Sequence, residues 1–158
     1  MKLATIYADV CKTFVHNLHK PPVHRCAIGE WDENTYAVTP DAFVVYLIPK
    51  KWCPFDAEKM SEYGQWRNPK RTILGDRPDT PKDVKLTTEC RYVPKVGAKP
   101  DTIQMLTDGT TQVWINPKFL KPFEGEVTFK ITAPNRPIHV YENGVLSGFI
   151  LPVRQPQK

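Results

Sequence analysis

The sequence predicts an α+β fold made of two units with a pseudo-twofold repeat, each unit being a helix followed by antiparallel strands. Apolar residues between Ala4 and His19 recur at steps of three and four, the pattern of an amphipathic helix, and three strand-like segments follow. Residues 107–154 repeat that order with a strand, a short helix and a three-stranded meander. Since the two halves share no convincing residue identity, the repeat is expected only in the fold.

Length and composition indicate one folded domain that spans residues 1–158. Hydrophobic residues make up 41% of the chain and aromatic residues 11%, which favours a packed core, while 16 prolines favour loops over long helices. The N-terminus lacks the apolar run of a signal peptide, and no stretch approaches the roughly 18 apolar residues of a membrane span. We therefore expect a cytoplasmic protein.

The first helix carries its cations on the face opposite its apolar stripe. Lys12, His16 and Lys20 are close together there because residues three or four apart are neighbours on a helix surface. A solvated helix face is the simpler interpretation. Three strands are predicted after the helix, at 23–31, 35–38 and 43–48, and the last is apolar enough to be buried on both faces.

A long insertion at about 50–83 interrupts the periodicity. Between Lys50 and Lys99 we count twelve Lys and Arg against seven Asp and Glu, so this segment carries the whole net charge of +5. Aromatic residues interleaved with cations can stack on bases and hold phosphates, but they also pin long loops to a domain. The sequence leaves both readings open and predicts one or two helical turns between Ala57 and Trp66.

Turn residues separate the predicted strands of the second half. Strand alternation resumes at 84–93, and 102–106 is expected to pair with 111–115 across Asp108-Gly109. Asn116 is a helix cap followed by Pro117, and Pro122 limits this helix to about two turns. Strands then follow at 126–131, 137–141 and 145–153, with a tight hairpin at Asn143-Gly144.

Two motifs of the second half carry a resemblance. Ile115-Asn116-Pro117-Lys118-Phe119-Leu120 opens the short helix, and Leu151-Pro152-Val153-Arg154 lies near the end of the chain. In this order they resemble the C-terminal domain of bacterial DNA polymerase III β sliding clamps. The resemblance covers residues 107–154 and implies a DNA-clamp-like fold whose helices pack on one side of the sheets.

In that family the helices line a ring and present basic groups to the DNA backbone. The resemblance therefore implies a non-catalytic protein that binds duplex DNA without reading sequence. It also implies self-assembly into a homo-oligomer, because one domain per chain cannot encircle DNA. The implied DNA-binding residues are Lys12, His16, Lys20, Lys118 and Lys121.

The family uses its Pro-containing C-terminal segment to bind short peptides of replication proteins. The resemblance implies the same role for Leu151, Pro152, Val153 and Arg154. The competing and nearly as strong interpretation is that 145–153 is only the closing strand of the core. The alternative function is a protein-interaction module of the same fold that does not bind DNA.

Motifs for catalysis, cofactors and metals are missing. The chain has no G-x-S-x-G, no H-E-x-x-H and no Gly-rich phosphate loop, so we predict no enzyme, no cofactor and no catalytic residue. Its four cysteines form no C-x-x-C pair and are expected to be free and largely buried. His16, His19, His24 and Cys26 are close in sequence, but their spacing does not favour a metal site.

Overall fold

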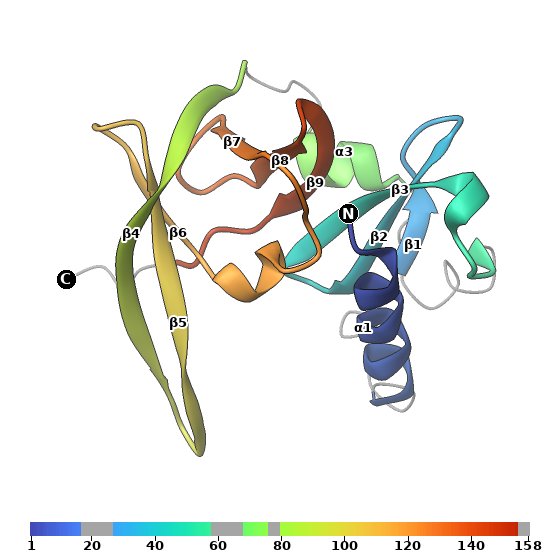
Figure 1. Ribbon diagram of the computed structural model, residues 1–158, viewed down its shortest axis with the longest axis horizontal. Helices are drawn as coiled ribbons and strands as arrows, with labels where there is room; N and C mark the ends of the chain where they lie inside the picture. The colour runs from blue at the N-terminus through green and yellow to red at the C-terminus, as the bar shows by residue number, and fades with distance from the viewer. Residues whose placement is uncertain (17–26, 58–67, 76–79, 155–158) are drawn as a thin grey trace.

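One antiparallel sheet of nine strands organises the part of the chain that the structure describes (Figure 1). The structure is a computed structural model, and it describes residues 1–16, 27–57, 68–75 and 80–154. The order across the sheet is β1-β2-β3-β9-β8-β7-β4-β5-β6, and all neighbours are antiparallel. The strands are β1 (Ala27–Glu30), β2 (Thr35–Asp41), β3 (Val44–Pro49), β4 (Lys82–Lys95), β5 (Ala98–Thr107), β6 (Gln112–Ile115), β7 (Val127–Ile131), β8 (Ile138–Glu142) and β9 (Val145–Ile150).

The predicted α+β clamp-like fold with two helix-plus-strand units is wrong. Strand β3 of the first half pairs with β9 of the second, so the strands of both halves belong to one sheet. The predicted second helix is only the 3₁₀ helix η3 (Pro117–Leu120), and α1 (Leu3–His16) is the one helix of more than six residues in the described chain. Pro117 and Pro122 frame η3 so closely that no regular α-helical ladder develops.

Helix α1 covers one face of the sheet and carries its apolar stripe inward. Ile6 and Val10 are fully buried and belong to the main core cluster. Phe119 brings η3 into the same cluster, as do residues from strands in both halves of the chain. Burial of each such side chain contributes about 1.5–3 kcal/mol, so this core supplies most of the folding free energy. Its largest fully buried members from the strands are Tyr46, Ile28, Ile48, Leu106, Ile115, Ile138, Ile150 and Val38.

The second helix of the described chain, α3 (Pro69–Leu74), lies on the opposite face, which also contradicts the expectation that all helices share one side. Asn68 caps α3 by accepting a hydrogen bond from the Arg71 amide. Ile73 packs there against Trp31 and Phe149 in a second core cluster. Since α1 and α3 cover opposite faces, β3 is buried on both, as its sequence predicted.

The insertion is attached to α1 where it is described. The 3₁₀ helix η2 (Lys50–Trp52) follows β3, and the Tyr7 hydroxyl donates to the Trp52 carbonyl. Phe55 packs edge-on against the Tyr7 ring, with 5.4 Å between centroids. The helical turns predicted between Ala57 and Trp66 lie almost entirely outside the described residues. Helix α3 was not predicted because its six residues are too few to show a period.

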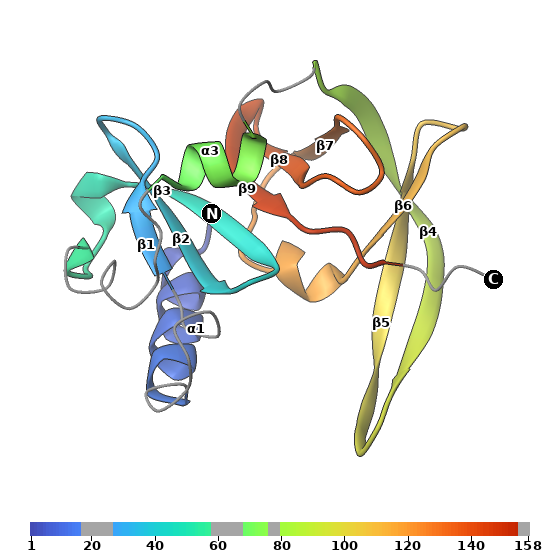
Figure 2. The ribbon, with the colours of Figure 1, turned by 180° about the vertical axis from the view of Figure 1, so that it is seen from behind.

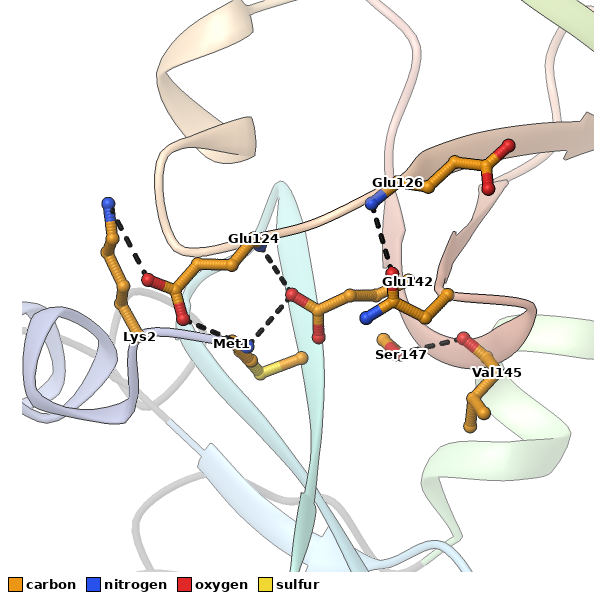
Figure 3. Close-up of polar contacts among 8 residues, drawn as sticks. Met1, Lys2, Glu124, Glu126, Glu142, Val145 and Ser147 are labelled. Atoms are coloured by element: carbon orange, nitrogen blue, oxygen red, sulfur yellow. Dashed lines mark hydrogen bonds and ion pairs between the residues drawn. The ribbon is translucent and has the colours of Figure 1, made fainter.

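The start of α1 is bound to the β8–β9 hairpin (Figure 3). The Met1 ammonium lies 2.8 Å from Glu142 and 3.4 Å from Glu124, and Glu142 also accepts a hydrogen bond from the Glu124 amide. Asn143 accepts from the Glu126 amide at 3.1 Å. The predicted Asn143-Gly144 turn is confirmed, with φ values of 50° and 79°. These polar contacts fix the helix against the second half of the sheet.

Candidate functional site

Strands β4 and β5 extend well beyond the rest of the sheet as a two-stranded ribbon (Figure 1 and Figure 2). Strand β7 pairs with β4 only at Lys82–Val84, and β6 pairs with β5 only at Gln104–Thr107. The ribbon between those pairings, residues 88–103, is here called the arm. No other strand of the described chain pairs with the arm, so both of its edges are open, and its faces are exposed beyond the buried Ile103 at its root.

The root of the arm is fixed by a small third core cluster. Ile103, Met105 and Trp114 are buried there, with Val93 and Val153 packed against them. The Arg91 guanidinium lies 4.3 Å from the centre of the Trp114 ring. A cation over an indole face contributes about 0.5–1 kcal/mol at an exposed site. The arm therefore leaves the sheet in one defined direction.

Beyond the root the arm exposes apolar and cationic side chains together. Tyr92 is 75% exposed, and Val96 is fully exposed at the tip. Lys95 pairs with Asp101 at 2.6 Å, while Lys99 forms no ion pair within the described chain. Gly97 completes the tip turn with a φ of 71°. Sequence reasoning predicted the two strands but missed the arm, although Gly97 between two strand-like segments was a usable hairpin signal.

Three of the predicted DNA-binding lysines lie exposed on α1 and beside it. Lys12 is on α1, Lys118 is in η3, and Lys121 directly follows η3. The Lys118 ammonium lies 4.7 Å from the centre of the Phe119 ring. The side chain of His16 and the whole of Lys20 lie outside the described residues.

Acidic groups are interspersed with these lysines. Asp41, in the β2–β3 turn, interacts electrostatically with both Lys118 and Asp9. Burial raises the pKa of Asp41, and Lys118 opposes that rise while Asp9 adds to it. Burial also raises the pKa of Tyr46, whose hydroxyl donates to the Phe119 carbonyl at 3.2 Å. The surface between α1 and η3 is thus mixed in charge rather than uniformly basic.

The arm, α1 and η3 lie on one side of the molecule. In both ribbon views α1 and the arm extend from the sheet in the same direction, and η3 lies between them (Figure 1 and Figure 2). Strand β5 contacts η3 directly. These three elements are therefore on the same side of the molecule (Figure 1 and Figure 2).

The C-terminal segment, predicted to bind partners, runs from β9 to the root of the arm. The Leu151 amide donates to Phe43 at 2.9 Å and the Val153 amide donates to Trp114 at 2.7 Å. Val153 packs into the third core cluster, Pro152 is half-buried, and Leu151 and Arg154 are exposed. Pro152 and Val153 are therefore partly covered by other residues of the chain, and Leu151 and Arg154 are the two residues of the segment exposed to a partner.

The described part of the chain holds free cysteines but no cluster of metal ligands. No group of three or more His, Cys, Asp and Glu residues there is arranged to hold a metal ion. Cys11, Cys53 and Cys90 are free, but Cys11 and Cys90 are exposed, which corrects the expectation that the thiols are largely buried. His19, His24 and Cys26 lie outside the described residues. Within that same part, no helix is long and apolar enough to cross a membrane.

Comparisons with known proteins do not identify a family. No protein-family model matches the chain, and neither the curated proteins nor the solved structures contain a match. The resemblance to sliding clamps stays an expectation from the sequence, so the function has to be argued from the surface itself.

Proposed function

We propose that the protein is a non-catalytic binding protein that holds duplex DNA by its phosphate backbone without reading sequence. The observation that carries this proposal is that Lys12 in α1, Lys118 in η3 and Lys121 just after η3 are all exposed, while α1 and η3 lie on the same side of the molecule (Figure 1 and Figure 2). Exposed lysines bind phosphates by releasing condensed counterions, which requires no preformed pocket.

The charge balance of the whole chain supports a polyanionic ligand. The net charge is +5, and the described residues between Lys50 and Lys99 hold nine cations against three acids. Several acids of the described chain already have cationic partners, as Glu30 has Lys50 and Asp83 has Lys130. The remaining cations give the surface a positive potential that attracts DNA at low salt.

A salt series tests the proposal. We expect the affinity for a short fluorescein-labelled duplex, measured by anisotropy, to fall steeply between about 50 mM and about 200 mM salt. Replacing Lys12, Lys118 and Lys121 together by Gln should weaken binding for all sequences alike and reduce the slope of log K against log salt by about one per lysine.

Arg136→Glu is the matched control. Arg136 is exposed in the turn between β7 and β8. Ile131, just before that turn, pairs with Lys82 at the start of β4, so the turn lies at the opposite end of β4 from the tip of the arm. This variant should bind as the wild type does. The triple variant lowers the net charge by three and Arg136→Glu lowers it by two. Equal losses per unit of charge would mean that only the net charge matters and would refute the assigned surface.

The second candidate is a protein-interaction module that does not bind DNA. It is favoured by one observation, namely that Asp41 interacts electrostatically with Lys118 and weakens the positive potential there. Absence of DNA binding at about 50 mM salt would favour this candidate over the DNA-binding function.

A further inference from the structure

The arm has no structural task that explains its length. A two-stranded hairpin is at best marginally stable in water without a third strand or a covered face. In β4 only Val84 is buried among 14 residues, and Val84 precedes the arm. Such an element adds little to the stability of the sheet, and its exposed length is available to a ligand.

The edges of the arm are poorly suited to pairing with another strand. Pro94 is in β4 and Pro100 is in β5, and a proline cannot donate to a ladder of hydrogen bonds. Lys85, Lys95 and Lys99 are exposed along the same strands, and lysines on an edge also oppose strand addition. The faces and the tip, rather than the edges, are therefore the surfaces available for binding.

The dimensions of the arm match a groove of duplex DNA. The major groove of B-DNA is about 12 Å wide and admits a two-stranded ribbon, whereas the minor groove is only about 6 Å wide. From Cys90 to Val96 the strand rises about 20 Å, at about 3.3 Å per residue. That length is enough for the tip to reach the groove floor, which is about 8.5 Å deep.

The side chains of the arm suit the same ligand. Lys95 and Lys99 flank the exposed Val96 at the tip of the arm. Two cations on either side of the tip suit the two rows of phosphates that border a groove of DNA. The ion pair of Lys95 with Asp101 and that of Arg91 with Glu89 lie at the surface, where each is worth at most about 1 kcal/mol. Lys95 can therefore exchange Asp101 for a phosphate at small cost. Tyr92 and Val96 add exposed apolar surface to the same part of the arm.

We infer that the arm lies in the major groove of the duplex whose backbone the lysines of α1 and η3 contact. This inference rests on the proposed DNA-binding function and assigns it a groove. It follows from three features of the arm, residues 88–103. No other strand of the described chain pairs with the arm, its prolines and lysines oppose pairing with a further strand, and it projects on the same side as α1 and η3.

Two arm variants and two modified ligands test the inference. Val96→Asp and Lys99→Glu place negative charge at the tip, and each should weaken duplex binding by about tenfold or more at about 50 mM salt. Arg136→Glu again serves as the control and should bind as the wild type does. Circular dichroism melting should show that both arm variants remain folded, since both positions are exposed.

Two changes to the DNA, each of which fills one groove, show which groove the arm occupies. A duplex with glucosylated hydroxymethylcytosine, whose sugars fill the major groove, should bind at least about tenfold more weakly than the plain duplex. Netropsin, which fills the minor groove, should leave binding unchanged. Block by netropsin with tolerance of glucosylation would place the ligand in the minor groove and overturn the inference.

Failure of the inference differs from failure of the proposed function. If the wild type binds with a steep salt dependence, but the arm variants and the glucosylated duplex behave normally, then the backbone contacts stand and the arm has no part in them. If the wild type does not bind DNA at about 50 mM salt, both proposals fall together.

Discussion

The arm and the rest of the sheet with its helices, here called the body, belong to one sheet but differ in how far their side chains are buried. In β3, within the body, every residue from Val44 to Ile48 is buried, because α1 covers one face and α3 the other. In β4, which forms half of the arm, Val84 is the only buried residue. The comparison shows that β-strand pairing alone does not make a core, and that coverage of the faces does.

The difference separates stability from binding. Buried apolar area in the body supplies the folding free energy, while the arm offers open side chains that folding does not need. Regions with few buried contacts open locally at low free energy. The arm is thus free to adapt to a ligand, and substitutions there should affect binding far more than folding.

The largest expected effect comes from a tyrosine of the body. Tyr46 is 2% exposed, lies in the main core cluster and packs against Phe123 at 5.6 Å between ring centroids. Tyr46→Ala removes these contacts and the hydrogen bond to Phe119, so we expect unfolding to become easier by about 3–5 kcal/mol. Urea denaturation measures the change, and a loss below about 1 kcal/mol would show that the main core does not depend on Tyr46.

The elements of the body could be predicted from sequence because each carries a local signal. The apolar stripe of α1, the continuous apolar run of β3 and the Asn143-Gly144 turn all appear in the structure as expected. The pairing of β5 with β6 across Asp108-Gly109 was also correct. In each case neighbouring residues determine the result.

The arrangement of those elements could not be predicted, because it depends on contacts between distant segments. Nothing local to β3 or β9 says that they pair and thereby join the two halves into one sheet. Helix α3 is too short to show a period, and the two prolines around η3 reduced a predicted helix to one turn. The site residues Lys12, Lys118 and Lys121 stay a prediction, since exposure is necessary for DNA contact but does not demonstrate it.

A glycine tests how closely the halves of the body are packed. A Cβ added at Gly148 in β9 would lie 2.5 Å from the Val45 carbonyl oxygen and 3.0 Å from the Phe123 ring. The β3 backbone cannot easily move away, so Gly148→Ala should destabilise the protein by about 1–3 kcal/mol. Gly109→Ala is a useful contrast because no atom lies within 4 Å of its added Cβ, and only its φ of 96° is unfavourable. A normal urea midpoint for Gly148→Ala would contradict tight packing of β9 on β3.

Acidification should weaken the body through a buried histidine. His139 in β8 is 7% exposed and packs edge-on against Phe149, and burial lowers the pKa of its imidazole below the ordinary value of 6.5. The unfolded chain then binds the proton more readily than the folded chain. This group's contribution is therefore fully present above about pH 6.5 and is lost as the pH falls towards the lowered pKa of the folded state.

The matched variant for this effect is His139→Gln, which cannot titrate. Its free energy of unfolding should depend less steeply on pH between about 7 and about 5 than that of the wild type. Identical slopes for the two proteins would show that His139 is accessible to protons without unfolding.

The smallest expected effect comes from the same substitution as the largest, made in the arm. Tyr92 is 75% exposed and lies opposite Thr102 in the ribbon, so Tyr92→Ala loses only one cross-strand pair. We expect the free energy of unfolding to change by about 0.5 kcal/mol or less. Because Tyr46→Ala and Tyr92→Ala delete the same atoms, their difference measures the effect of covering the ring, together with the hydrogen bond that Tyr46 donates to Phe119. A loss above about 2 kcal/mol for Tyr92→Ala would mean that something covers the arm in solution, and the contrast between arm and body would disappear.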